Sequence, residues 1–248
     1  MKFLFLLLSC LVLSLPSTGI SADKEMHIFL LIGQSNMAGR AKLKPGDDTT
    51  ISDCKLWNGK SWEEAKAPFN RYATIKKGGF TQGMNPGPEF VKAYQKANPN
   101  VQVGIINWAR GGSSIEQWDP GKNLYQSAVK QTKSALKLGG KLKGILWHQG
   151  ESNSKKAAQY PKLLKAHVER LRKEFSTPNL PFVFGQIGEW NKGYKDFNEM
   201  IVKQTSNIPN SACISSKGLT KMDNFHFNHE SQLEMGKRYA EEMLKLLK

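Results

Sequence analysis

Short apolar segments alternate with segments of helical spacing along most of this chain. The apolar segments cover residues 26–32, 101–106, 144–147, 181–185 and 212–214. The helical segments cover residues 86–97, 124–138, 156–175, 194–205 and 230–247. Continuous apolar strands that alternate with helices are typical of a parallel sheet with helices on both faces. The sequence therefore predicts an α/β fold with about five strands. Residues 40–85 show a weaker pattern.

The first 22 residues have the features of a secretory signal peptide. Lys2 gives a positive head, residues 3–15 are apolar, and residues 16–22 are mostly small. The apolar run is shorter than the ~20 residues that cross a bilayer. Cys10 lies inside this run, which disfavours a lipoprotein anchor. We therefore expect a signal peptide over residues 1–22, a single domain over residues 23–248 and a secreted or periplasmic protein without a membrane span.

The chain carries a formal net charge of +15, and two cysteines follow the predicted signal peptide. The lysines are spread along predicted helical faces, which favours a solvated basic surface over nucleic-acid binding. Attraction to acidic polysaccharide or an anionic cell surface stays open. Cys54 and Cys213 form either one disulfide or two free thiols, and we favour free thiols.

Polar residues follow the predicted strands at the positions where ligand sites form in parallel sheets. Ser35 follows the first strand, residues 110–113 follow the second, residues 148–151 follow the third, and residues 223–226 precede the last helix. Because the carboxyl ends of parallel strands share one sheet edge, we expect these loops to meet there.

Ser35, Asp223 and His226 are the parts of a hydrolytic triad. A serine hydroxyl needs a base to take its proton and an acid to orient that base. Met37 stands where a GxSxG elbow has its second Gly, so the ordinary α/β-hydrolase signature is absent. Ser35 as a helix cap is the alternative. A metal cluster of Asp223, His226 and His229 is less favoured, because no HExxH helix or carboxylate-rich partner supports it.

Three donors are available for a developing oxyanion. The Ser35 N–H, the Gly112 N–H and the Gln149 side-chain amide fit this role, although Gly112 in an ordinary turn and Gln149 as a packing amide are the alternatives. Glu151 either holds a loop or supplies a second acid to His226.

Further substrate contacts are expected beside these groups. Gln34 and Asn36 flank Ser35, and Trp118 follows the glycine loop, where it is placed to lie beside a sugar ring. Core packing is the usual alternative for a tryptophan.

Four blocks resemble the SGNH-type esterases, and within them carbohydrate esterase family 6 and the sialate O-acetylesterases. The blocks are GQSNMAGR (33–40), ARGGSSIEQW (109–118), GILWHQGESN (144–153) and GLTKMDNFHF (218–227), in family order. The resemblance implies a three-layer α/β/α sandwich of flavodoxin-like topology around a parallel sheet of about five strands. It also implies a serine esterase that removes O-acetyl groups from carbohydrate without a metal or cofactor.

Carried over by motif, Ser35 is the nucleophile, His226 the base and Asp223 its orienting acid. Gly112 and Gln149 become oxyanion donors alongside the Ser35 amide, and Gln149 stands where other SGNH enzymes have Asn.

Two further positions bear on the acid and on the substrate. The resemblance makes Glu151 an auxiliary helper to His226. Asn153 stands where Asp is frequent in the carbohydrate esterases, which leaves the choice of substrate open.

These expectations describe a secreted acetylesterase of the acetylxylan esterase kind that acts on acetylated carbohydrate. The alternatives are a sialate O-acetylesterase, a lipase or thioesterase on the same scaffold, and a carbohydrate-binding relative without activity. The sequence does not define the sugar, the acetyl position or the oligomeric state.

Overall fold

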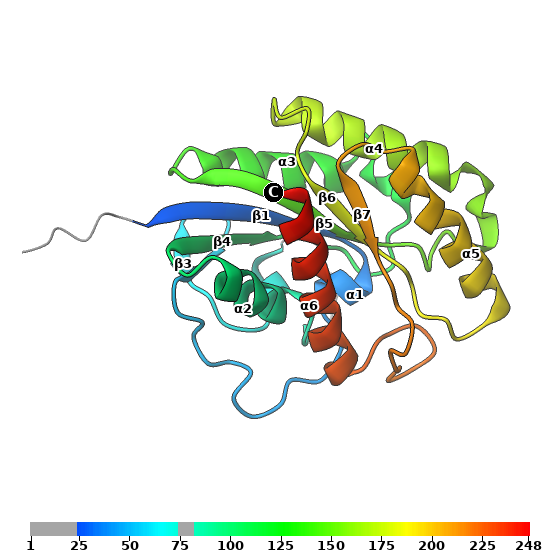
Figure 1. Cartoon of the computed structure of the whole chain (residues 1–248), viewed down its shortest axis with the longest axis horizontal. Helices are drawn as coiled ribbons and strands as arrows, with labels where there is room; N and C mark the ends of the chain where they lie inside the picture. Colours follow the sequence, from blue (N-terminus) through cyan, green and yellow to red (C-terminus); the bar gives the residue numbers. More distant parts are fainter. Residues whose placement is uncertain (1–23, 74–81) are drawn as a thin grey trace, which may run out of the picture.

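A central seven-stranded sheet organises the computed structural model, which describes residues 24–73 and 82–248 (Figure 1). The predicted signal peptide lies outside the described residues. The strands are β1 (Glu25–Gly33), β2 (Cys54–Trp57), β3 (Trp62–Glu64), β4 (Val101–Asn107), β5 (Lys141–His148), β6 (Phe182–Gly185) and β7 (Ser211–Ile214). Their order across the sheet is β3-β2-β4-β1-β5-β6-β7, and every neighbouring pair except β2–β3 is parallel.

The α/β prediction is confirmed, and the strand count is corrected from about five to seven. Strands β1, β4, β5, β6 and β7 match the five apolar segments. The two added strands, β2 and β3, extend one edge of the sheet and lie in the weakly patterned region. They have four and three residues, and each combines apolar side chains with charged ones. Segments this short do not establish a periodic pattern.

Helices cover both faces of the sheet, which gives the predicted three layers. The α-helices are α1 (Ser35–Ala38), α2 (Gly87–Ala97), α3 (Asn123–Leu136), α4 (Tyr160–Glu174), α5 (Lys192–Val202) and α6 (His229–Leu246). Short 3₁₀ turns are η1 (Phe69–Tyr72), η2 (Ile115–Trp118), η3 (Ser154–Gln159) and η4 (Lys203–Ser206). Helices α2 and α6 lie on one face, and α3, α4 and α5 lie on the other (Figure 1).

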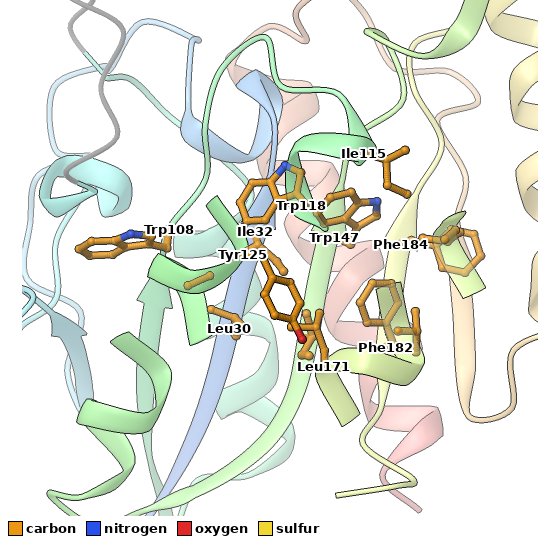
Figure 2. Close-up of a cluster of buried hydrophobic side chains, with 14 of the residues drawn as sticks. Leu30, Ile32, Trp108, Ile115, Trp118, Tyr125, Trp147, Leu171, Phe182 and Phe184 are labelled. Atoms are coloured by element: carbon orange, nitrogen blue, oxygen red, sulfur yellow. The ribbon is translucent and has the colours of Figure 1, made fainter. Parts of the chain in front are cut away.

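Strand β1 contributes side chains to both cores, because alternate residues of a strand point to opposite faces. Leu30 and Ile32 join the core under α3 and α4, where Figure 2 shows them near the aromatic residues. Phe29 and Leu31 join the core under α2 and α6. Burial on both faces explains why the strand is a continuous apolar run.

The loops that follow β1, β4 and β5 meet at one edge of the sheet. Strand β1 lies between β4 and β5, so the chain changes direction across the sheet at this point. Ligand sites in such sheets form at this switch point. Gly33 ends β1 with a φ of +134°, and a Cβ there would lie 2.7 Å from the carbonyl carbon and 2.8 Å from the amide nitrogen of His148. Glycine at position 33 therefore allows the backbones of β1 and β5 to approach each other closely beneath the site.

The two cysteines after the predicted signal peptide are free thiols. Cys54 lies on β2 and Cys213 on β7, with four strands between them in the sheet. This separation excludes a disulfide in the folded protein. None of the helices in the described part of the chain is long and apolar enough to cross a membrane.

Candidate active site

Ser35, His226 and Asp223 lie in one hydrogen-bonded line, although 191 residues separate Ser35 from His226 along the chain. The Ser35 Oγ atom is 3.0 Å from His226 Nε2, and His226 Nδ1 is 2.7 Å from Asp223 Oδ2. An ionised carboxylate only accepts, so Nδ1 of a neutral imidazole carries the proton and Nε2 accepts from the serine hydroxyl. The three groups are therefore arranged for transfer of the Ser35 proton to His226.

Asp223 also shapes the turn that presents His226. Its Oδ1 atom accepts hydrogen bonds from the N–H groups of Phe225 (2.7 Å) and His226 (2.8 Å). Partial burial opposes ionisation of Asp223, but the hydrogen bonds from the His226 ring and from these two N–H groups outweigh it and hold the pKa of the carboxyl below its ordinary value. Asn228 then caps α6 by accepting from the Ser231 N–H at 3.0 Å, which fixes the end of the loop.

Among the described residues, His226 is the histidine that hydrogen-bonds Ser35. Burial lowers the pKa of His148 and of His167 to about 3, so both rings are neutral. His148 Nδ1 is 3.0 Å from the Tyr239 hydroxyl, and His229 Nε2 is 2.8 Å from Asp47 Oδ2. His229 is therefore bonded to Asp47 and not to Asp223 or His226, the pair that the metal interpretation would have joined to it.

A cleft of about 590 Å³ opens above Ser35. Its lining residues are Gln34, Ser35, Arg40, Gly111, Gly112, Glu151, Ser152, Met222, Asp223, Phe225 and His226. The N–H groups of Ser35 and Gly112 have no acceptor among the described residues. Gly112 has a φ of +72°, and a Cβ at this position would meet no atom within 4 Å. The Gly112 backbone is therefore open to a ligand in the cleft.

Gln149 lies behind Gln34 and is not part of the cleft wall. Its Nε2 atom donates to the Asn153 side chain at 2.7 Å, to the Ser113 carbonyl at 3.1 Å and to the Gln34 side chain at 3.2 Å. These three acceptors share its two hydrogens. The role of Gln149 as an oxyanion donor stays a prediction, and it requires release of one of these acceptors. Gln34 does line the cleft, as expected for a substrate contact.

Asn153 binds a neighbouring acid through its amide group. Its Nδ2 atom donates to both carboxylate oxygens of Glu116, at 3.0 and 3.1 Å. An aspartate would place a second carboxylate there, so the Asn at this position matches the local environment.

Asn36 is fully buried, which corrects the expectation that it contacts substrate. Its amide binds Glu151 Oε1 (2.6 Å), the Phe225 carbonyl (3.1 Å), the Phe227 N–H (3.1 Å) and Gln232 Nε2 (3.2 Å). Sequence position beside Ser35 had indicated the cleft, but the first turn of α1 directs this side chain toward the loop of His226.

Glu151 lines the cleft, and its carboxyl group binds Asn36. Burial raises the pKa of Glu151 to about 7, although hydrogen bonds from the backbone and from Asn36 act in the opposite direction. Its Oε2 atom is buried and has no partner among the described residues. The carboxylate bonded to His226 is that of Asp223.

Trp118 is fully buried, which corrects the expectation that it lies beside a sugar ring. Its Nε1 atom donates to Ser113 Oγ at 3.0 Å, and its ring packs edge-on against Trp147 with ring centroids 5.4 Å apart (Figure 2). The apolar side chains on the cleft are instead Phe225 and Met222, which are 54% and 49% exposed. Phe225 lies inside the DNFH block, so an aromatic residue next to the histidine was a signal available in the sequence.

The fold is that of the α/β carbohydrate esterases. A solved structure of an Arabidopsis thaliana protein, AT4G34215, superposes with a TM-score of 0.80 at 29% identity and covers 90% of this chain and 98% of its own. A carbohydrate acetylesterase from Xanthomonas citri superposes with a TM-score of 0.66 at 20% identity, over 89% of this chain and 56% of that one. A family 3 carbohydrate esterase from Clostridium thermocellum has a TM-score of 0.54 at 10% identity, over 90% and 98%.

The family follows from sequence similarity. The family model described as "Carbohydrate esterase, sialic acid-specific acetylesterase" matches residues 25–245. The chain is also 31% identical to the probable carbohydrate esterase At4g34215 of Arabidopsis thaliana, over 88% of this chain and 90% of the relative. The protein therefore belongs to this carbohydrate esterase family, and it is a carboxylic ester hydrolase of the carbohydrate acetylesterase class.

Proposed function

We propose that this protein removes O-acetyl groups from a carbohydrate by acyl transfer through Ser35. The observation that carries the proposal is the line of hydrogen bonds from Ser35 Oγ to His226 Nε2 and from His226 Nδ1 to Asp223. An esterase needs a nucleophile, a base and an oriented acid in this order.

The reaction has two steps. His226 takes the Ser35 proton as Oγ attacks the acetyl carbonyl carbon, and the resulting oxyanion accepts hydrogen bonds from the Ser35 and Gly112 N–H groups. His226 then gives the proton to the departing sugar oxygen, which leaves an acetyl ester on Ser35. Water attacks this ester with His226 as base, and acetate leaves as Ser35 regains its proton. Gln149 joins as a third donor when it releases one of its present acceptors.

The character of the cleft supports a sugar as the alcohol component. Most of its lining side chains are polar, and Phe225 and Met222 form an apolar rim beside His226. An aromatic ring next to polar groups suits a sugar, which has apolar C–H faces and hydroxyl edges. A lipase would need a long apolar channel for the acyl chain. We place the sugar against Phe225 and the acetyl group above Ser35.

The experiment is to measure acetate release from acetylated xylan and from O-acetylated sialic acid. Wild type is compared with Ser35→Ala and with Ser127→Ala, which loses a hydroxyl that binds Trp108 outside the cleft. We expect release that Ser35→Ala abolishes and Ser127→Ala retains. Release from xylan would support the acetylxylan esterase proposal, and release from sialic acid the sialate esterase alternative. Equal activity of Ser35→Ala and wild type would refute the mechanism.

Export is the remaining part of the proposal. Residues 1–22 have the charge, apolar core and small-residue end of a signal peptide. N-terminal sequencing of the protein recovered outside the cytoplasm tests it, and we expect a mature chain that begins near Asp23. A chain that keeps its first 22 residues would contradict this expectation.

A further inference from the structure

The side-chain amide of Asn36 binds both residues that flank His226. Its Nδ2 atom donates to the carbonyl of Phe225, and its Oδ1 atom accepts from the N–H of Phe227. A residue in a parallel β-ladder binds the same two groups, the C=O before and the N–H after its partner. Asn36 therefore holds the backbone of His226 as a neighbouring strand would.

Hydrogen bonds fix the Asn36 amide group in one orientation. Its second Nδ2 hydrogen goes to Glu151 Oε1 at 2.6 Å, and its second Oδ1 lone pair accepts from Gln232 Nε2 at 3.2 Å. An amide offers two donors and two acceptor sites, and all four are used. The partners come from the loop after β5, the His226 loop and helix α6. An inverted amide would set oxygen against oxygen at Glu151 and at Phe225.

The position of Asn36 in the sequence links this contact to the nucleophile. Asn36 follows Ser35 directly, so one short helical turn carries both the nucleophile and the side chain that holds His226 in place. Phe227 is also buried and packs against Trp190, with ring centroids 5.0 Å apart, which anchors the far side of the loop. His226 lies between this anchored residue and the exposed Phe225. The distance from Ser35 Oγ to His226 Nε2 is thus tied to the Asn36 amide.

We propose that Asn36 is the positioning residue that sets His226 against Ser35, and that Glu151 acts by orienting Asn36. This inference rests on the proposed function, because it assigns roles within the same site. It changes the role expected for both residues: Asn36 contacts no substrate, and Glu151 is no second acid to His226. The position of His226 matters because a displacement of about 1 Å in a reacting group costs about 100-fold in rate.

Variants that exchange hydrogen-bond donors and acceptors test the contact between the side chains of Asn36 and Glu151. Asn36→Asp removes the Nδ2 donor and sets a carboxylate against Glu151 and the Phe225 carbonyl. Glu151→Gln alone leaves an oxygen that accepts from Asn36, whereas in the double variant its new amide donates to the carboxylate introduced at position 36. The matched control is Asn198→Asp, because the Asn198 amide also binds a backbone N–H (2.9 Å) and a backbone carbonyl (2.7 Å), both of Ile187, outside the cleft.

Steady-state hydrolysis of p-nitrophenyl acetate is the assay, with the nitrophenol burst counting functional sites. For Asn36→Asp we expect kcat per functional site to fall about 100-fold while KM changes less than about threefold. We expect Glu151→Gln and Asn198→Asp to stay within about tenfold of wild type, and the double variant to regain about tenfold over Asn36→Asp. Should Asn36→Asp fail to fold, Asn36→Ala carries the same kcat test.

Three results separate the outcomes. A kcat per functional site for Asn36→Ala within about threefold of wild type would overturn the proposal. Glu151→Gln as damaging as Asn36→Asp, with no gain in the double variant, would instead assign Glu151 a direct action on His226. A wild-type protein inactive on every ester would refute the proposed function itself, before the variants are compared.

Discussion

The stability of this protein depends on pH through Glu151, and the substitution Glu151→Gln removes this contribution. Its buried carboxyl group has a pKa of about 7, against an ordinary value of 4.5. Between these two pH values the folded chain keeps a proton that the unfolded chain has lost. The folded state then binds more protons than the unfolded state, so the free energy of unfolding falls as pH rises.

The size of this effect follows from the two pKa values. Each pH unit between 4.5 and 7 removes about 1.4 kcal/mol, so about 3 kcal/mol is lost across the window. The stabilisation from the protonated Glu151 carboxyl group is complete below pH 4.5 and absent above pH 7. Glu151→Gln has no titrating group at this position, although its new amide NH₂ occupies the place of the unpartnered Oε2 atom at a constant cost of about 1–3 kcal/mol.

Urea unfolding of wild type and Glu151→Gln from pH 4.5 to pH 8 measures the difference. Other titrating groups are common to both proteins and cancel. We expect the free energy of unfolding of wild type minus that of the variant to fall by about 3 kcal/mol as pH rises from 4.5 to 7 and then to level off. A difference that stays constant with pH would refute the assignment of a raised pKa to this carboxyl group.

Three further variants address the acid, the sheet edge and the rim. Asp223→Asn removes the charge that orients and stabilises the His226 ring, and kcat on p-nitrophenyl acetate should fall about a thousandfold; a near-normal kcat would show that another group orients the ring. Gly33→Ala combines a φ of +134° with a clash against the His148 backbone, so urea melts should show a loss of about 2–6 kcal/mol; an unchanged midpoint would contradict the close approach. Phe225→Ala should raise KM for an acetylated oligosaccharide about tenfold and leave p-nitrophenyl acetate within about twofold, because only the sugar packs on this ring; equal effects on both substrates would remove Phe225 from sugar binding.

The sequence pattern predicted the sheet and the meeting of its loops because both depend on the order of elements. Strands β1, β4 and β5 are continuous apolar runs, and topology alone brings Ser35 and residues 110–113 to one edge. Strands β2 and β3 were not predicted, because segments of four and three residues do not establish a periodic pattern of apolar side chains.

Side-chain direction was the part of the site that the sequence did not determine. Asn36 and Trp118 stand next to site-forming residues, yet both are buried, because their direction depends on which polar and aromatic partners the fold brings to them. Asn36 finds its partners 115 to 196 residues away in the chain. No local pattern encodes contacts of that range. The same holds for Glu151, because burial within the fold is the largest cause of its raised pKa.

Capture of the acyl-enzyme tests the central claim most directly. Wild type is mixed with p-nitrophenyl acetate, quenched in acid within the first turnover, digested and analysed by mass spectrometry, with Ser35→Ala treated in parallel. We predict one added acetyl group on the peptide that contains Ser35, and none on the corresponding peptide of Ser35→Ala. An acetyl group on another side chain, or turnover in Ser35→Ala at the wild-type rate, would contradict the assignment of Ser35 as the nucleophile.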